Sequence, residues 1–342
     1  MDWRERLKWR TVQNSAGVST ISSAYRAGKI GFDHLRTGHP ETRRLLHRAL
    51  KIARTDLPVL VVGETGTGKN LLAQAIHNAS GVPGDFVAVG PADLPKDLAE
   101  SALFGHQRGA FTGADRARPG LIEAAAGGTL FIDEILELSE TIQTKLLNVV
   151  DYRKYRPVGA AAEKRTTARL VVGIQGDPDR AVAAGRLRSD LLYRLKGAVF
   201  RLPPLRERGD DAVALAREFT EQAARRKGLP LGELTPAAID AIRAYSWPGN
   251  VRELKRAAEV AVVYAEGRAI DPRHLGLDRL ASQPLGEADG PPSLKREDLE
   301  RWAYAKALER TGGNRRAAAR LLGVSEATLY RRLGSFRTRE RE

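Results

Sequence analysis

Residues 57–70 read LPVLVVGETGTGKN, and this stretch decides the fold. Its apolar run, Val59–Val62, predicts a fully buried strand. A glycine-rich loop follows, and then an apolar-periodic segment over Leu71–His77 that predicts a helix. Such a loop turns backbone N–H groups inward, and the start of the helix adds partial positive charge. Lys69 can then reach terminal phosphates, so the stretch predicts a nucleotide-binding P-loop.

The nucleotide expected in this loop is ATP, with Mg²⁺ bound alongside. The alternative is a glycine turn before a helix, with no ligand, and the lysine argues against it. The motif usually ends in Lys-Ser or Lys-Thr, whereas Asn70 here removes the hydroxyl that normally binds Mg²⁺. The expected nucleotide contacts are Gly63, Glu64, Thr65, Gly66, Thr67, Gly68, Lys69 and Asn70.

A second stretch, residues 127–134, reads GGTLFIDE and predicts a buried strand that ends in two carboxylates. Groups at the carboxyl ends of strands face the ligand crevice of an α/β sheet. Asp133 is therefore expected to hold Mg²⁺ through water, and Glu134 to orient and deprotonate the attacking water. Alone, Asp-Glu after an apolar run is often just a strand end. Downstream of a P-loop it indicates ATP hydrolysis.

Composition restricts the class of protein. The chain has 342 residues, enough for more than one domain with a sizeable core. It has no cysteine, which excludes disulfides and thiolate zinc sites and fits a reducing, cytoplasmic setting. No apolar run approaches the roughly 18–20 residues of a membrane span. The N-terminus, MDWRERLKWR, lacks the apolar core of a signal peptide.

The net charge of +14 is concentrated at the two ends of the chain. Residues 1–54 carry twelve basic and four acidic side chains, and residues 293–342 carry thirteen and seven. Residues 55–292 are therefore neutral overall. A polyanion such as double-stranded DNA would explain basic ends on a neutral body. Basic ends kept for solubility remain an alternative, more so for the N-terminal arm.

Strand and helix patterns alternate after the P-loop, which predicts an α/β fold with a parallel, doubly wound sheet. Strands are expected at 59–62, 86–89, 129–132 and 170–174, and helices at 40–54, 71–77, 94–102 and 142–150. From 210 to 267 the pattern is helical only. Thr235-Pro236 predicts a helix start, and Asn250 with Glu253 resembles a capping pair.

Composition shifts divide the chain into five segments. These are a basic N-terminal arm (1–37), an α/β subdomain (38–209), a helical lid (210–277), a Pro/Gly/Ser-rich linker (278–292) and a small helical domain (293–342). No stretch before residue 38 is long enough for a sensor domain. Control by a separate partner, by expression level or by the arm is therefore expected.

Residues 109–114, GAFTGA, carry a family resemblance, because residues 38–277 resemble the AAA+ domain of sigma-54-dependent transcription activators. From physics alone, Phe111 between glycines predicts a mobile loop that contacts a partner, or else an ordinary loop whose Phe111 turns inward. The resemblance implies that this loop touches sigma-54. The contact residues it implies are Gly109, Ala110, Phe111, Thr112, Gly113 and Ala114.

Two further blocks resemble the same family. Residues 187–195, LRSDLLYRL, look like the segment that carries its arginine fingers. The resemblance implies that Arg188 and Arg194 reach the nucleotide of a neighbouring subunit, where a guanidinium can be worth about 10³–10⁵ in rate. A surface arginine in a basic protein is the alternative for either one. Residues 247–254, WPGNVREL, look like the lid sensor, which implies that Arg252 reaches the phosphates.

The sequence departs from the family close to the chemistry. Gly90 stands where the family usually has an Asn that restrains the catalytic Glu. Ile174-Gln175 replaces the usual Thr-Asn sensor, and Asn70 replaces an acidic residue. Gln175 can still hydrogen-bond, whereas Ile174 cannot. We therefore expect ATP binding and hydrolysis, with weaker coupling between sigma-54 contact and turnover.

The C-terminal segment has helix-turn-helix spacing and looks like the Fis-type domain that ends many of these activators. Helices are expected at 315–322 and 326–333, with Gly323-Val324 as the turn. A helical hairpin used for dimerisation is the alternative. The expected DNA contacts are Arg315, Arg316, Arg320, Ser325, Glu326, Ala327, Thr328, Arg331 and Arg332.

Together these features predict a sigma-54-dependent activator, with ATP hydrolysed at subunit interfaces of a ring, expected to be a hexamer that rests as a dimer. Its partners would be sigma-54, RNA polymerase and enhancer-like DNA. Two alternatives stay open: a DNA-binding regulator that uses ATP only for assembly, and an AAA+ remodeller of another client tethered to DNA.

Overall fold

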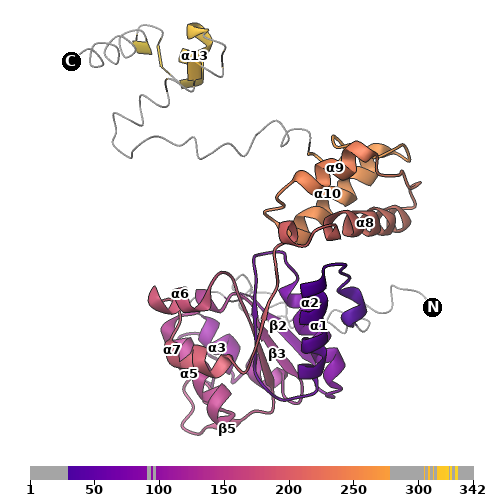
Figure 1. The fold of residues 1–342 in the computed structure, drawn as a ribbon. Helices are drawn as coiled ribbons and strands as arrows, with labels where there is room; N and C mark the ends of the chain where they lie inside the picture. The colour runs from indigo at the N-terminus through magenta and orange to yellow at the C-terminus, as the bar shows by residue number, and fades with distance from the viewer. Residues whose placement is uncertain are drawn as a thin grey trace. The chain divides into compact units, whose positions relative to one another are not determined.

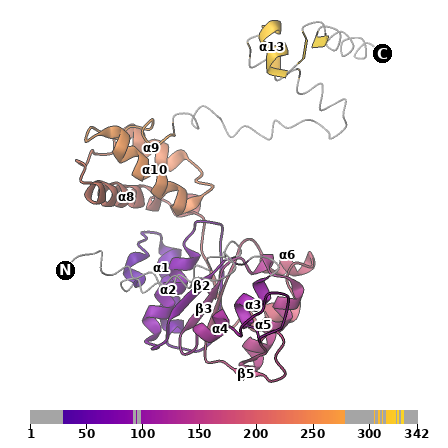
Figure 2. The ribbon, with the colours of Figure 1, turned by 180° about the vertical axis from the view of Figure 1, so that it is seen from behind.

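The computed structural model describes residues 30–90, 94 and 98–277. In the C-terminal region it describes 304, 307, 308, 311, 314–322, 324, 325, 328 and 329. Contacts between residues divide the chain into two compact units, Met1–Ala281 and Ser282–Glu342. Figures 1 and 2 show their helices and strands from opposite sides.

The first unit is built on a five-stranded parallel sheet with the strand order β2-β3-β6-β1-β7. The strands are β1 (Val59–Val62), β2 (Phe86–Val89), β3 (Thr129–Ile132), β6 (Arg169–Ile174) and β7 (Ala198–Arg201). The predicted α/β fold is confirmed, and the first three strands lie at the predicted residues. The pattern did not predict β7, which pairs with β1.

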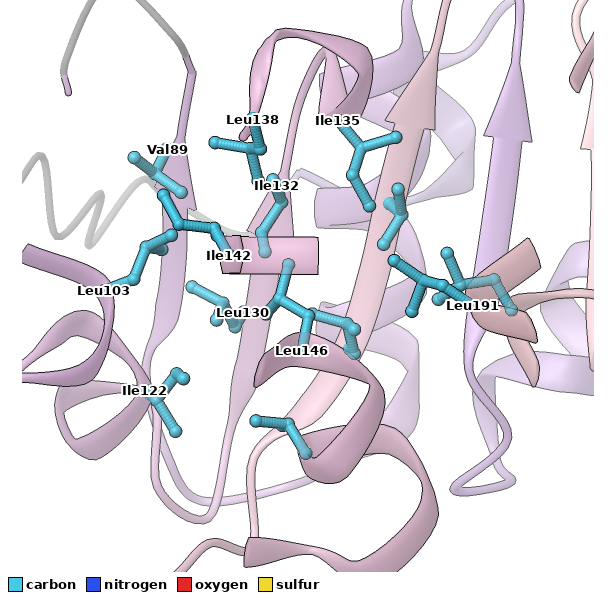
Figure 3. Packing of buried hydrophobic residues seen from close by; sticks show 14 of the residues in the cluster. Val89, Leu103, Ile122, Leu130, Ile132, Ile135, Leu138, Ile142, Leu146 and Leu191 are labelled. Atoms are coloured by element: carbon cyan, nitrogen blue, oxygen red, sulfur yellow. The ribbon is translucent and has the colours of Figure 1, made fainter. Parts of the chain in front are cut away.

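Alternate residues of each strand pack on opposite faces of the sheet. In β1, Leu60 and Val62 join one buried cluster, whereas Val59 and Val61 join the other. The first cluster packs under α3 (Ala99–Phe104), α4 (Leu121–Ala124), α5 (Glu140–Tyr152), α6 (Pro178–Ala183) and α7 (Ser189–Leu195), and Figure 3 shows part of it. The second packs under α1 (Pro40–Ala53) and α2 (Lys69–Ser80). Burial of both faces explains why the strands are continuous apolar runs.

One predicted helix begins later than expected. The helix predicted over 94–102 is α3, which runs from Ala99 to Phe104. Leu94 is buried but lies in a bend. The residue before a proline is disfavoured in helical conformation, and Pro95 follows Leu94. A short hairpin of β4 (Lys154–Tyr155) and β5 (Lys164–Arg165) was also absent from the prediction.

Residues 211–265 form the all-helical part of the first unit. Its helices are α8 (Asp211–Lys227), α9 (Pro236–Ala244) and α10 (Asn250–Ala265), which enclose a core of their own around the buried Trp247. Thr235 caps α9 as predicted, because its side chain accepts a hydrogen bond from the Ala238 N–H. The predicted cap at Asn250 is wrong in part. Gly249 is the N-cap, and its N–H donates to Glu253 Oε2, while the Asn250 side chain points elsewhere.

The described residues of the second unit agree with the predicted helix-turn-helix. Helix α13 spans Arg315–Leu322, as predicted. Ser325 Oγ accepts a hydrogen bond from the Thr328 N–H, the contact that a serine makes when it caps the start of a helix, here the one predicted at 326–333. A small apolar cluster fills the angle between these segments: Tyr304, Ala307, Leu308, Ala318, Ala319, Val324 and Leu329.

His77 gives the first unit a predictable dependence on pH. It lies on the buried face of α2, with Nδ1 2.9 Å from Thr129 Oγ1, and burial lowers its pKa below the ordinary value of 6.5. The folded state therefore binds fewer protons than the unfolded state just below pH 6.5. Its stabilising contribution is complete above pH 6.5 and is lost as the pH falls toward the folded-state pKa.

Replacing His77 by glutamine should accordingly flatten the fall in stability between pH 7 and pH 5. At most one proton is involved, so the slope changes by up to about 1.4 kcal/mol per pH unit. Urea denaturation at several pH values measures it. The matched control is His47→Gln, which removes a histidine from the exposed face of α1. Equal slopes for the His77 variant and the wild type would contradict the assignment.

Candidate active site

The glycine-rich loop lies between the end of β1 at Val62 and the start of α2 at Lys69. Gly66 and Gly68 have φ of 82° and 108°, in the left-handed region that favours glycine. A Cβ on Gly66 would also lie 2.2 Å from the Gly249 carbonyl oxygen. Glycine is therefore required at Gly66 both by the backbone conformation and by the close approach of the helical part.

Lys69 is the centre of the site. Its side chain is only 5 % exposed, and Nζ donates to the Gly63 carbonyl at 3.1 Å and to Glu134 Oε1 at 3.0 Å. Asp133 Oδ1 lies 3.9 Å from the same nitrogen. A buried ammonium needs anionic or carbonyl partners, and these three oxygens provide them. Phosphate oxygens have the same acceptor chemistry, so the geometry fits a phosphate in this loop.

The two carboxylates follow β3, as the sequence predicted. Glu134 has a left-handed φ of 50°, and its N–H donates to Asp133 Oδ1 at 3.1 Å. Burial raises the pKa of Asp133, and the charge of Lys69 opposes this shift. A Cβ on Gly173, in the neighbouring strand β6, would lie 2.4 Å from Asp133 Oδ1. The glycine in β6 therefore makes room for the Asp133 carboxylate.

The residues at the end of β6 are divided between the core and the site. Ile174 is fully buried in the apolar cluster of the sheet. Gln175 is exposed, and its Oε1 accepts a hydrogen bond of 3.0 Å from the Thr65 hydroxyl. Thr67 Oγ1 donates to the Glu64 carbonyl within the loop, and the Asn70 side chain is exposed. The expected sensor residue Gln175 thus contacts the P-loop itself.

The arrangement fits a nucleotide with a divalent cation. The left-handed glycines, the buried lysine and the paired carboxylates meet at one edge of the sheet. Within the described residues, no cluster of three or more His, Cys, Asp or Glu side chains could hold a metal ion. Mg²⁺ commonly binds through one or two carboxylates together with substrate phosphates, and Asp133 fits that role.

Arg252 lies in the first turn of α10, where its guanidinium is exposed. Its positive charge acts to lower the pKa of Asp133, and a Cβ on Gly66 of the P-loop would lie 3.3 Å from the Arg252 Cβ. The structure therefore brings five of the predicted site residues around one edge of the sheet: Lys69, Asp133, Glu134, Gln175 and Arg252.

Arg188 and Arg194 are held elsewhere in the same chain. Arg188 Nη2 lies 2.7 Å from Asp190 Oδ2, and Arg188 Nη1 lies 3.1 Å from Glu140 Oε1. Arg194 Nε lies 2.9 Å from Asp151 Oδ1. Both guanidinium groups are partners of carboxylates on or near α5 and α7, and neither is among the groups around Lys69.

The GAFTGA loop is closed by hydrogen bonds between its own backbone groups. The Gly109 N–H donates to the Ala114 carbonyl at 2.8 Å, and the Ala114 N–H to the Phe111 carbonyl at 3.0 Å. Phe111 is half-buried, and its ring lies 5.0 Å from that of His106 in an edge-to-face arrangement. The tip residues Gly109, Thr112 and Gly113 are exposed. The aromatic ring is thus partly covered at the base of an exposed tip.

The hairpin of β4 and β5 is hydrogen-bonded to the residues that precede this loop. The Gln107 N–H donates to the Val158 carbonyl, and the Val158 N–H donates to the Gly105 carbonyl, both at 2.9 Å. A Cβ on Gly159 would lie 2.8 Å from the Ala110 Cβ. No apolar pattern marks this hairpin in the sequence, because its strands are only two residues long and mostly polar.

The expected DNA contacts fall in two groups. Arg315 and Arg316, in the first turn of α13, and Ser325 are exposed, while Thr328 is half-buried. The positions or side chains of the other five lie outside the described residues: Arg320, Glu326, Ala327, Arg331 and Arg332.

Comparison with known proteins decides the family. Residues 35–201 match the sigma-54 interaction domain, 206–290 the AAA+ ATPase lid domain, and 295–336 the bacterial regulatory protein, Fis family. The chain is 41 % identical over 299 residues to the transcriptional regulatory protein ZraR of Klebsiella oxytoca, which covers 86 % of this chain and 67 % of ZraR. The chain belongs to the sigma-54-dependent transcription activators.

A second relative and one solved structure agree. The response regulator protein PilR of Pseudomonas aeruginosa is 39 % identical over 303 residues, covering 86 % of this chain and 67 % of PilR. The crystal structure of NtrX from Brucella abortus in complex with ATP superposes with a TM-score of 0.67 at 28 % identity. It covers 91 % of this chain and 69 % of that one. The resemblance predicted from the GAFTGA and P-loop motifs is therefore confirmed.

The family assignment makes this sigma-54 activator a member of the AAA+ ATPases, with a helix-turn-helix domain of the Fis type. Among the described residues, no helix is long and apolar enough to cross a membrane.

Sequence reasoning missed one group of residues at the site. Arg206, in the turn η6 (Leu205–Glu207), forms two hydrogen bonds to the P-loop residue Glu64. Asn250 also reaches this loop. The only signal in the sequence was the acidic residue Glu64 inside the P-loop, because a carboxylate does not help a loop to bind an anion. Its partners are 142 and 186 residues away, beyond the reach of local patterns.

Proposed function

We propose that this chain is a ring-forming ATPase that remodels the closed complex of sigma-54 RNA polymerase, anchored by its C-terminal domain to an enhancer-like DNA site. The observation that carries the proposal is the buried Lys69 between the P-loop carbonyl of Gly63 and the carboxylates of Asp133 and Glu134. The intact GAFTGA sequence points to the client. The proposed segments are those expected from the sequence, with the lid at 210–277.

The residues of the site have separate roles in this proposal. The backbone of the P-loop and the ammonium of Lys69 bind the phosphates of ATP. Asp133 would hold Mg²⁺, and the bound ion would neutralise charge that develops on the transferred phosphoryl group. Glu134 orients a water molecule and accepts its proton, and Lys69 leaves Glu134 Oε1 for the phosphates when ATP enters. Arg252 contacts the terminal phosphate from the lid.

Hydrolysis is completed across a subunit interface. Arg188 and Arg194 exchange their carboxylate partners for the nucleotide of the next subunit. Both side chains are partly exposed, at 32 % and 54 %, so the exchange needs no unfolding. The ion pairs that must be given up lie at the surface, where solvent screening leaves such pairs with little effect on stability. In this proposal the chains assemble into a ring, expected to be a hexamer, and rest as a dimer.

The test is open-complex formation on a sigma-54 promoter. Purified protein, sigma-54 RNA polymerase and promoter DNA are combined with ATP or with a non-hydrolysable analogue, and promoter melting is followed by permanganate footprinting. We expect melting with ATP only. Melting in neither mixture, from protein that hydrolyses ATP, would instead favour a remodeller of another client.

One observation favours a second candidate function. Gln175 contacts Thr65, Ile174 is buried, and Asn70 supplies no hydroxyl, so the sensor and metal positions depart from the usual pattern. A regulator that binds DNA and uses ATP only to assemble would tolerate these changes. If the protein regulates a target promoter equally well with ATP and with the non-hydrolysable analogue, that result would support this second function.

A further inference from the structure

Residue Glu64, inside the P-loop, is held by the turn that leads into the lid. Arg206 Nη1 donates to Glu64 Oε2 at 2.9 Å, and Arg206 Nη2 donates to Glu64 Oε1 at 2.7 Å. Two parallel bonds of this kind fix direction as well as distance. Hydrogen bonding by Arg206 lowers the pKa of Glu64, so the carboxylate stays ionised. The P-loop, which would bind phosphate, thus carries a negatively charged side chain, Glu64. Its carboxylate is bonded to the guanidinium of Arg206, away from Lys69.

Asn250 joins the same carboxylate to the lid. It is fully buried, and its Nδ2 donates to Glu64 Oε2 at 3.1 Å and to the Thr65 carbonyl at 3.0 Å. Its Oδ1 accepts the Leu205 N–H at 2.8 Å. One amide therefore connects the P-loop, the turn η6 and the first residue of α10. Its φ of 52° is uncommon for a residue with a side chain, and these bonds stabilise it.

The backbone of α10 is fixed on the P-loop at the next residue. The Val251 N–H donates to the Gly66 carbonyl at 3.1 Å. The Gly249 carbonyl lies where a Cβ of Gly66 would be. Arg252 follows directly, and a Cβ on Gly66 would lie 3.3 Å from the Arg252 Cβ. The contacts of Glu64 and Asn250 therefore fix the backbone from which the Arg252 side chain projects beside the P-loop.

These contacts do little for the stability of the lid itself. The lid has a separate apolar core around Trp247, to which Glu64 and Arg206 do not belong. The side chains of Arg206 and Glu64 are 42 % and 36 % exposed, and an exposed ion pair contributes about 0–1 kcal/mol. The paired hydrogen bonds between Arg206 and Glu64 are therefore better explained by positioning than by stabilisation.

We propose that Glu64, Arg206 and Asn250 form a clamp that places Arg252, and that the clamp thereby sets the preference for a nucleoside triphosphate over a diphosphate. The clamp residues are positioning residues, because they act through Arg252. This inference rests on the proposed binding of ATP. It adds that discrimination depends on side chains that do not contact the phosphates.

The test compares nucleotide affinities in variants of the full chain. Isothermal titration calorimetry gives the Kd of ADP and of a non-hydrolysable ATP analogue for the wild type and for Arg206→Gln, Glu64→Gln and Arg252→Gln. We expect each variant to lower the ratio of triphosphate to diphosphate affinity by about tenfold, within the range of coupling between contacting residues. The affinity for ADP should change by less than about twofold.

A double variant separates positioning from an independent effect. On the Arg252→Gln background, Arg206→Gln should lower the ratio no further, because the clamp acts only through Arg252. Arg206→Lys, which keeps the charge but loses the paired hydrogen bonds, should fall between the wild type and Arg206→Gln. The matched control is Arg243→Gln, which removes an exposed ion pair with Asp210 on the lid and should leave the ratio unchanged.

The outcomes distinguish failure of the clamp from failure of the proposed function. Suppose that the wild type binds both nucleotides and that Arg206→Gln and Glu64→Gln leave the affinity ratio unchanged. The clamp is then overturned, while the proposed ATPase function stands. The clamp is also overturned if the double variant lowers the affinity ratio by the product of the two single effects. A wild type that binds neither nucleotide overturns the proposed ATPase. Thermal unfolding of each variant, followed by circular dichroism, checks that the chain is folded.

Discussion

Replacing Glu134 by glutamine is expected to lower the steady-state ATPase rate by about 10²–10⁴-fold, the usual contribution of a positioned general base. Glutamine has nearly the same shape and keeps an oxygen that can accept the hydrogen bond from Lys69 Nζ, now 3.0 Å from Glu134 Oε1. It cannot accept a proton. The affinity for ATP should therefore change by less than about threefold while turnover is lost.

The matched control is the same substitution three residues further on. Glu137 lies in the turn η5 (Ile135–Glu137) and is exposed. Its Oε1 lies 3.5 Å from Arg186 Nη2, in an exposed ion pair away from Lys69. Glu137→Gln should keep the wild-type ATPase rate. The decisive comparison is made at saturating ATP with a phosphate-release assay. Equal, near-zero rates in wild type and Glu134→Gln would contradict hydrolysis and support assembly by ATP binding alone.

The part of the site that sequence predicted well is local in the chain. The P-loop and the Asp-Glu pair follow buried strands within a few residues, so apolar runs place them at the correct edge of the sheet. The order of the strands was not needed for this, because parallel strands present their carboxyl ends at the same edge. Lys69 and Glu134 therefore meet at 3.0 Å although they are 65 residues apart.

The part that sequence did not predict depends on tertiary contacts. Asn250 with Glu253 fits a capping pattern, and Glu253 does bond to the Gly249 N–H as that pattern requires. The amide of Asn250 instead bonds to Glu64 and Thr65, because the P-loop lies against the start of α10. Local rules assign a polar side chain to its nearest backbone partner. They fail where a distant segment supplies a better one.

The same limit applies to the arginines and to the loop. Sequence placed Arg188 and Arg194 near a nucleotide through the family resemblance, and within one chain both are paired with neighbouring carboxylates. A single chain cannot supply the partner subunit that the proposal requires. Likewise, no pattern indicated that the Phe111 ring would lie on His106.

The second large effect is expected at Phe111. Replacing it by alanine should abolish binding to sigma-54 in the presence of a transition-state analogue of ATP hydrolysis, while the ATPase rate stays within about twofold of wild type. The ring is half-buried against His106, and the loop is closed by the bond from the Gly109 N–H to the Ala114 carbonyl. Contact with a partner therefore requires the ring to leave His106.

The cost of that release is small enough for a nucleotide-driven step. One aromatic pair contributes about 0.5–1.5 kcal/mol beyond its buried area. Gly109 and Gly113, with φ of 78° and 92°, lie in the left-handed region, and glycine moves in and out of that region without the steric cost of a side chain. The released ring would then add its apolar surface to an interface, where aromatic side chains commonly dominate binding energy.

A matched control removes an aromatic ring elsewhere. Tyr264→Ala, on the lid helix α10, deletes a side chain that is 65 % exposed and should leave both sigma-54 binding and ATPase unchanged. Native gel shift with labelled sigma-54 measures the complex. If Phe111→Ala still formed the complex with wild-type affinity, another segment would have to make the contact. Retained binding with lost promoter melting would place Phe111 in the remodelling step that follows recognition, because the ring would then transmit movement without supplying affinity.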